Sequence, residues 1–261
     1  MTPEQLAADP DAFRPQWVNP STFWTSLDKA LAMCPAVGPD DQAMADQART
    51  LLALYASGPA YKALLDEAAL IADTELHAAA KYVHVGVDAG NGWQRQENAG
   101  VWGSDWFGRV LAAVVYIMVN DYREAIYFIR AADADARPLY GMHRYTLTFP
   151  RDGLPPVDLK RSGFWSLTMY TDDLFMLADP PNGRANIGTV NLEASQLQFS
   201  TDGSLTLHLS SQQPADATGQ ANWLPAPDGG FVLCLRTYVP TGALLDGGYT
   251  LPNIARVNGR A

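Results

Sequence analysis

The chain has 261 residues, of which 48% are apolar and 18% charged, with a formal net charge of −10 at pH 7 and a pI of about 4.7. This composition is typical of a globular protein with a substantial core and excludes a chain that is disordered throughout. Up to residue 135 there are 18 acidic and 9 basic residues, against 10 and 9 afterwards, and no basic stripe occurs, so we expect no nucleic-acid partner.

The first residues, "MTPEQLAADPDAF", lack the basic and apolar regions of a secretory signal. The longest apolar run, "VLAAVVYIMV" at 110–119, is about half the length of a membrane span and favours a buried helix. Cys34 and Cys234 lie far apart and make no disulfide framework, and Cys234 fits a small core residue. We therefore expect a cytoplasmic protein with no membrane partner.

The first part of the chain is rich in alanine and has helical spacing of its apolar residues. Ser21 or Thr22 is a suitable N-cap for the first helix, and Ser104 or Asp105 for the last. The last segment has an interruption at Asn120-Asp121. The pattern predicts a helical region over residues 1–135, with helices at 20–34, 40–57, 59–85 and 104–130.

After residue 135 the period of the apolar residues changes to two. We predict strands at 143–150, 163–171 and 231–240, and a hairpin at 197–210 that turns at Asp202-Gly203. No alternation of strand and helix indicates a Rossmann-type sheet. The expected fold is therefore α+β, with the N-terminal helical region packed on a C-terminal antiparallel β-sandwich, jelly-roll-like, over residues 136–261.

Residues 139–257 resemble a bacterial family of unknown function, DUF1214. The resemblance rests on five motifs in the family's order, namely "RYTLTFPRDGLPPVD", "FWSLTMYTDD", "STDGSLTLHLSSQQP", "ANWLPAPDGGFVLCLRTYVP" and "LLDGGYTLPNIARV". The upstream "NGWQRQENAGVWGSDWFGRV" and "DYREAIYF" resemble the helical segment that precedes this domain in the family.

The resemblance implies a jelly-roll-like sandwich for the C-terminal part, in agreement with the period of two. Longer relatives carry another β-rich domain ahead of it, where this chain has a helical pattern. Any function that needs that first domain is therefore in doubt for this chain. The family supplies no established reaction.

No motif indicates a cofactor or a metal. His77 and His84 lie seven residues apart on a predicted helix, about 10 Å by helix rise, which is too far for one ion, and neither His143 nor His208 belongs to a metal-binding motif. No GxSxG elbow, GxGxxG loop or phosphate-binding loop occurs in its required context. We expect neither a cofactor nor a bound metal.

The catalytic candidates lie in "WGSDWFGR", where Asp105 and Arg109 are four residues apart on a predicted helix among aromatic side chains. In a pocket, burial could tune Asp105 as a general base while Arg109 holds an oxyanion, with His84 as the second choice of base. The structural alternative is a helix cap with an Asp105–Arg109 ion pair.

The substrate-binding candidates are polar or aromatic side chains in the motif segments and beside the first turn of the last helix. Arg236 follows a buried run, so its guanidinium needs a carboxylate from a ligand or from the protein itself. Ser166, Thr168 and Tyr170 share one face of their strand and could line a cavity. The full set is Trp102, Arg144, Tyr170, Asn222, Trp223, Arg236 and Tyr238.

Two functions fit this set. The first is a cofactor-independent enzyme of the lyase, isomerase or hydrolase type, using acid–base chemistry on a small apolar, aromatic or sugar-like molecule between helices and sandwich. The second is a non-catalytic module that binds a small molecule or takes part in an assembly. A small-molecule ligand is the expected partner, and a homo-oligomer is left open. We favour the enzyme, which requires a pocket with an unpaired carboxylate or histidine of shifted pKa.

Overall fold

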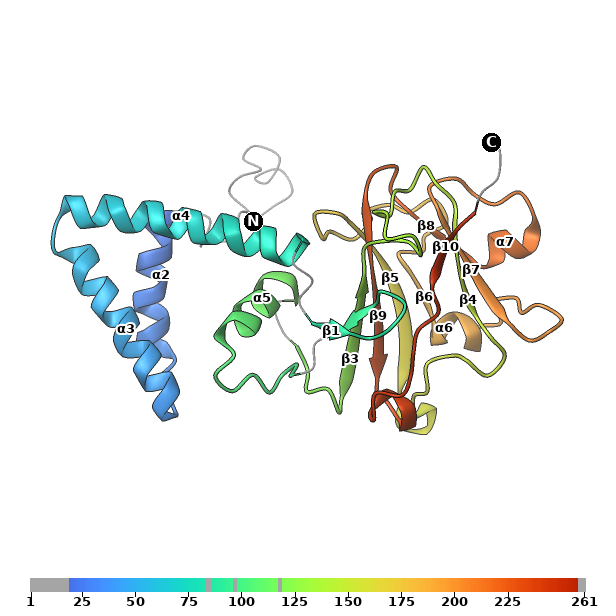
Figure 1. Ribbon diagram of the computed structural model, residues 1–261, viewed down its shortest axis with the longest axis horizontal. Coiled ribbons are helices and arrows are strands. Elements are labelled where there is room, and N and C mark those ends of the chain that lie inside the picture. Colours follow the sequence, from blue (N-terminus) through green and yellow to red (C-terminus); the bar gives the residue numbers. More distant parts are fainter. Residues whose placement is uncertain (1–18, 83–85, 96–97, 117–118, 258–261) are drawn as a thin grey trace. The chain divides into compact units, whose positions relative to one another are not determined.

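The computed structural model describes residues 19–82, 86–95, 98–116 and 119–257. The chain divides into two compact units, and the boundary falls between residues 82 and 83. Helices form the first unit, coloured blue to cyan in Figure 1, and the second unit holds the β-sheets. The predicted α+β class is confirmed. The observed boundary lies well before the predicted one at residue 135, because strands between residues 87 and 130 already belong to a sheet.

Three helices make up the described part of the first unit: α2 (Pro20–Met33), α3 (Pro39–Ala56) and α4 (Pro59–Tyr82). Each begins with a proline, whose fixed φ suits the first turn of a helix. The predicted Ser21 or Thr22 cap is wrong, because the backbone N–H groups of Thr22 and Phe23 donate to the carbonyl of Asn19. The indole of Trp24, which is buried, stacks on Tyr55 with 5.2 Å between ring centroids and holds α2 against α3.

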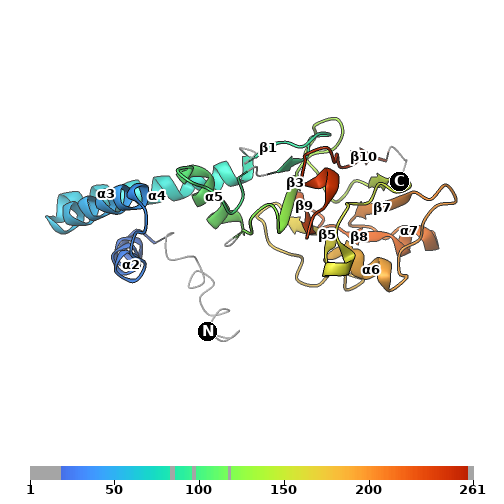
Figure 2. The ribbon, with the colours of Figure 1, turned by 90° about the horizontal axis from the view of Figure 1, so that it is seen from below.

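The second unit contains two sheets (Figure 2). The larger sheet has the order β1 (Val87–Asp88), β2 (Gln94–Arg95), β3 (Ala125–Arg130), β9 (Phe231–Tyr238), β5 (Phe164–Thr171) and β6 (Asn186–Gly188). The smaller sheet has the order β10 (Ile254–Arg256), β4 (Tyr145–Phe149), β7 (Leu205–Ser210) and β8 (Trp223–Pro225). Strands β7 and β8 are parallel, which differs from the fully antiparallel sandwich that we predicted.

The core of this unit lies between the two sheets. Phe128, Leu167 and Leu235 of the larger sheet and Leu147 and Leu207 of the smaller one belong to a single buried cluster. Apolar residues alternate along these strands, so one face of each sheet points into the core. Short helices connect the strands: η3 (Leu159–Arg161), α6 (Thr189–Glu193), α7 (Ala217–Ala221) and η4 (Gly242–Leu244).

The long helix predicted over 104–130 is wrong beyond its first half. Helix α5 (Trp106–Tyr116) ends early, and a turn in which Glu124 N–H donates to the carbonyl of Asp121 leads into β3. In β3 the residues Ile126 and Phe128 face the core while Tyr127 points to the other face. Aromatic and β-branched side chains with this alternation favour a strand once a partner strand is present.

The predicted hairpin at 197–210 is a strand only in its second half. Gly203, with φ of +85°, makes the turn, and Asp202 Oδ1 accepts a hydrogen bond from Ser204 N–H. Residues 197–200 are not a strand, and β7 instead pairs with β4 and β8.

Candidate functional site

The face of the larger sheet that points away from the core carries a polar and aromatic set of side chains, which we call the outer face. Register places Tyr127, Arg236 and Ser166 opposite one another on β3, β9 and β5. The next outward row along the strands is Ala125, Tyr238 and Phe164, and on the other side Cys234 lies opposite Thr168.

Arg236 lies at the centre of the outer face and is partly buried. Its Nη1 donates to Thr168 Oγ1 at 2.8 Å, and its Nη2 donates to the hydroxyl of Tyr170. The guanidinium carbon also lies 5.5 Å from the centroid of the Tyr170 ring, within the range of a cation–π contact. Among the residues that the structure describes, no carboxylate forms an ion pair with this guanidinium.

Aromatic rings flank this arginine. The rings of Tyr238 and Phe164 stack with centroids 4.6 Å apart, and the hydroxyl of Tyr238 lies 3.3 Å from that of Tyr127. Burial, with the Tyr238 hydrogen bond, raises the pKa of Tyr127, and burial raises the pKa of the Cys234 thiol to about 11. Both groups are therefore neutral at pH 7, and Arg236 is the charge among these contacting side chains.

Much of the outer face is covered. Cys234 is 2% exposed and Thr168 is 4% exposed, and Val119, from the segment before β3, packs against the Ala125–Tyr127–Cys234 cluster. Low exposure strengthens electrostatic interactions because little water screens them.

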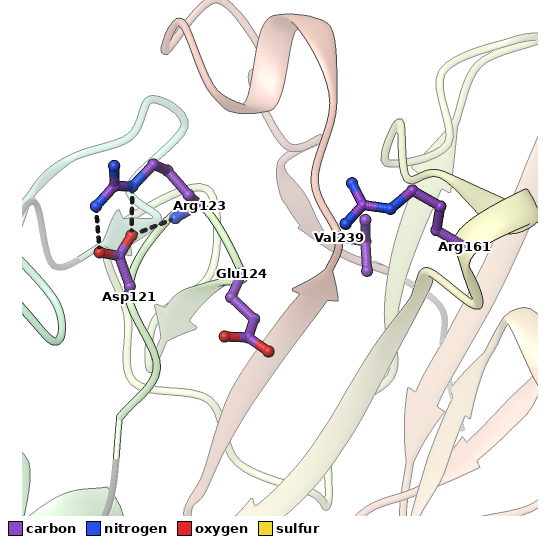
Figure 3. Close-up of a pocket in the computed structure, with 5 residues that line it drawn as sticks. All are labelled: Asp121, Arg123, Glu124, Arg161 and Val239. Atoms are coloured by element: carbon purple, nitrogen blue, oxygen red, sulfur yellow. Dashed lines mark hydrogen bonds and ion pairs between the residues drawn. The ribbon is translucent and has the colours of Figure 1, made fainter.

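A hollow of about 420 Å³ lies at the end of this face, where β9 stops and β3 begins. Figure 3 shows Asp121 and Arg123 on one side, Arg161 on the other, and Glu124 and Val239 between them. The hydrogen bonds from Arg123 hold the pKa of Asp121 at about 2. Within the described residues, the side chains of Glu124 and Arg161 make no hydrogen bond or ion pair, so this hollow contains charges of both signs that a ligand could meet.

The predicted base, Asp105, acts as the cap of α5. Its Oδ1 accepts from Gly108 N–H at 2.9 Å and its Oδ2 from Asn98 Nδ2 at 2.8 Å, and the side chain is exposed. These bonds, the one from Asn98 first, lower the pKa of Asp105, whereas a base that works near neutral pH needs a raised one. Asp105 and Arg109 are both described and form no ion pair with each other.

Arg109, Trp102 and His84 were predicted to belong to the same site as Asp105. The guanidinium of Arg109 lies over the ring of Trp106, 5.3 Å from its centroid. Trp102 is partly buried, and its carbonyl accepts the backbone N–H of Asp105. His84 lies outside the described residues. A catalytic role for these residues stays a prediction.

Three predicted binding residues belong to the smaller sheet or its loops. Asn222 is 2% exposed and exchanges two hydrogen bonds with the backbone of Gln198, at 2.7 and 2.9 Å. Trp223 is also buried, and its indole N–H donates to the carbonyl of Ser210 at 2.9 Å. Arg144 is exposed and contacts Gln212 at 3.4 Å. The chain itself therefore satisfies the polar groups of the buried Asn222 and Trp223 side chains.

The structure therefore brings together Tyr170, Arg236 and Tyr238 from the predicted set, with Thr168 as an arginine partner. Tyr127 was missed, because its segment was predicted as helix, whereas the prediction of Cys234 as a small buried residue is confirmed. The aromatic and β-branched residues of "AIYFIR" are the signal that could have favoured a strand there and so placed Tyr127 on the same face.

Two further properties bear on the site. Within the described ranges, no three His, Cys, Asp or Glu side chains gather closely enough to ligate a metal ion. None of the helices in those ranges combines the length and the apolar character that crossing a membrane requires.

Residues 124–242 match the sequence model of a family described as "Protein of unknown function (DUF1214)", which confirms the resemblance seen in the motifs. No curated protein matches the chain. Among solved structures, the VPA0106 protein from Vibrio parahaemolyticus is similar, with 21% identity, a TM-score of 0.48, and coverage of 85% of this chain and 52% of that one. A putative uncharacterized protein from Burkholderia cenocepacia has 14% identity, a TM-score of 0.36, and coverage of 94% and 51%. The chain spans about half the length of each.

Proposed function

We propose that the β-rich unit of this chain, whose residues 124–242 belong to the DUF1214 family, binds a small organic anion on its outer face. The ligand is a carboxylate with an aromatic or apolar body. The observation that carries the proposal is the partly buried guanidinium of Arg236, which has two hydroxyl partners and no carboxylate partner among the described residues.

A partly buried positive charge is costly unless an opposite charge compensates it. Two of the five N–H donors of Arg236 go to Thr168 and Tyr170, and hydroxyl groups carry no charge. The planar fork of a guanidinium fits a carboxylate with two parallel hydrogen bonds. A bound carboxylate would therefore supply the charge that the chain does not.

Arg130, another buried arginine of the same sheet, shows a different solution. Its Nε donates to the carbonyl of Ala132 and its Nη2 to the carbonyl of Asp133 and, at 3.4 Å, to Asn253. These oxygens accept its hydrogen bonds, and the negative charges of Asp133 and Asp88 oppose the lowering of its pKa by burial, so the chain itself compensates this arginine. The hydroxyls around Arg236 can also rotate and donate to a ligand oxygen, which suits a binding site.

The stacked rings of Tyr238 and Phe164 lie one outward row from Arg236 and would contact the body of the ligand. Ring stacking and edge contacts contribute beyond the apolar area that they bury. The thiol of Cys234 and the phenol of Tyr127 are neutral and supply no base. These groups favour binding over acid–base catalysis, and the enzyme function stays a prediction. The cytoplasmic location, which these groups do not test, also stays a prediction.

The test uses the full chain with benzoate, phenylacetate and hexanoate as probes and benzamide as the neutral analogue of benzoate. We expect at least one carboxylate to bind in calorimetry and to shift the Nε–H resonance of Arg236 in NMR spectra. Because a charge-assisted hydrogen-bond pair is lost, Arg236→Met should weaken binding by about 10-fold or more, and benzamide should be weaker by a similar factor.

Arg49→Met is the matched control, because Arg49 is an exposed arginine of the helical unit that pairs with Asp46. It should leave probe binding unchanged. Melting temperatures of both variants check that they fold. The proposal is contradicted if none of the three carboxylates binds, or if folded Arg236→Met binds them as tightly as the wild type.

A further inference from the structure

A second hollow, of about 230 Å³, lies at the edge of the larger sheet, between the β1–β2 turn and the segment that follows η4. Its walls include Asp88, Gly90, Arg95, Tyr249 and Thr250, and Phe128 lines it from the core side. Pockets for drug-sized ligands measure roughly 300–1,000 Å³, so this hollow suits a smaller molecule.

The walls are held rigidly in place. Asn91 Nδ2 donates to the carbonyl of Leu251 at 2.8 Å, and the indole N–H of the buried Trp93 donates to the carbonyl of Pro252 at 2.8 Å. The β1–β2 turn is therefore pinned to the chain that forms the opposite wall. A preorganised wall lowers the entropic cost of binding a ligand.

Arg95 supplies the positive charge of this hollow. It lies opposite Phe128 in the sheet and is partly buried. Within the described residues its guanidinium has neither a hydrogen bond nor an ion pair. A Cβ placed on Gly247, whose φ is +79°, would lie 3.2 Å from Arg95 Nη2, so bare backbone passes close beside the guanidinium.

The remaining polar groups suit hydroxyls. Asp88 Oδ1 accepts from Gly90 N–H at 2.9 Å, which fixes the carboxylate and leaves Oδ2 to accept from a ligand. The hydroxyl of Tyr249 donates to the carbonyl of Gly153 at 2.9 Å, so its ring is held firmly at the wall. Thr250 adds a hydroxyl. Asp88 and Arg95 are both described, line the same hollow and form no ion pair with each other.

We propose that this hollow binds a small hydroxylated carboxylate of the sugar-acid class. Arg95 holds the ligand carboxylate, Asp88 accepts hydrogen bonds from its hydroxyl groups, and the Tyr249 ring lies against its C–H face. The site is distinct from the one at Arg236, because Arg95 shares the core-facing row of Phe128 whereas Arg236 shares the outward row of Tyr127. This inference does not rest on the proposed function.

The test titrates the full chain with galacturonate, galactose and inorganic phosphate, using calorimetry and NMR. Galacturonate should bind the wild type, and galactose, which has no carboxylate, should bind about 10-fold or more weakly. Arg95→Met and Asp88→Asn should each weaken galacturonate binding by a similar factor, Arg95→Lys and Thr250→Val by less. Arg137→Met, at an exposed arginine paired with Asp135, is the control and should change nothing.

Two results would overturn the proposal. The first is a failure of galacturonate to bind, or equal binding by folded Arg95→Met. The second is phosphate binding as tight as that of galacturonate together with tighter binding by Asp88→Asn, which would make the hollow a simple anion site without hydroxyl recognition. Melting temperatures of all variants separate loss of binding from loss of folding.

Discussion

The two faces of the larger sheet are made by the same three strands and have opposite chemistry. Toward the core, β3, β5 and β9 present Phe128, Leu167 and Leu235, which the smaller sheet covers. Toward the other side they present Tyr127, Thr168 and Arg236. The core face contributes stability through apolar burial, whereas the outer face places a charge where the described chain offers only neutral partners.

The polar side chains away from solvent are of two kinds, those that the backbone of the chain satisfies fully and those that keep an uncompensated charge. Asn222 and the Trp223 indole are satisfied by backbone of the chain, and no further partner is needed. The guanidinium of Arg236 has hydroxyl partners and a charge still to be balanced. Groups of the first kind should matter for folding, and those of the second kind for binding.

The largest effect is expected from Leu167→Ala on the core face. Leu167 is fully buried, and truncation of a buried leucine costs about 2–5 kcal/mol through lost burial and the cavity left behind. Ser166→Ala, one residue earlier and on the outer face, is the control and should change the free energy of unfolding by less than about 0.5 kcal/mol. Urea unfolding of both variants measures the difference. Similar losses for the two would mean that the faces are not distinct.

An intermediate effect is expected from Asn222→Ala. The substitution removes two hydrogen bonds between the buried Asn222 side chain and the backbone of Gln198, at a cost of about 1–3 kcal/mol. Asn222→Asp keeps one acceptor but places a buried carboxylate oxygen against the carbonyl of Gln198, so near neutral pH its cost should equal or exceed that of alanine. Thermal unfolding measures stability, and benzoate titration of the folded variants should show unchanged affinity. A weakened affinity would place Asn222 in the binding site after all.

The smallest effect is expected from Asp105→Ala. Loss of an N-cap costs about 0.5–2 kcal/mol, and the lower half of this range applies because the side chain is exposed. Asparagine also caps helices, so Asp105→Asn should cost less. Chemical denaturation at pH 7 compares the three proteins.

The pH dependence of this cap has a definite sign. Hydrogen bonds from Asn98 and Gly108 hold the folded-state pKa of Asp105 below its ordinary value of 3.8. Its stabilisation is therefore complete above pH 3.8 and is lost as the pH falls through the lower folded-state pKa. The advantage of wild type over Asp105→Asn should shrink below pH 3.8. An advantage that grows on acidification would instead indicate a raised pKa, as the general-base hypothesis requires.

Much of the fold could be predicted because the periodicity is local. The strands around Tyr145 and Phe164 were found from alternating residues, the strand around Phe231 from its apolar run, and the three helices of the first unit from their spacing. Strand β3 was not, because a short apolar run of this kind is compatible with either a helix or a strand. Strands β1 and β2 contain two residues each and leave no periodic signal.

The candidate site was predicted only in part, because its residues come together through contacts between distant parts of the chain. Tyr170 was selected because it shares a strand face that could line a cavity, and Arg236 and Tyr238 because polar residues at the end of an apolar strand need partners. Asn222 and Trp223 were selected by the same argument, yet backbone groups nearby satisfy them. Local sequence shows that a partner is needed and does not show which one is within reach.

By itself, the sequence determined which residues of the later strands alternate, that the first part of the chain is helical, and that Arg236 follows a buried run. Only the tertiary structure decided which side chains surround Arg236. Thr168 and Tyr170 lie 68 and 66 residues away in the chain, and only the antiparallel register of β5 on β9 brings their hydroxyls to the guanidinium. The period of two within a strand determines on which face each side chain lies. What that face contacts is determined by the neighbouring strand, which here is distant in the sequence.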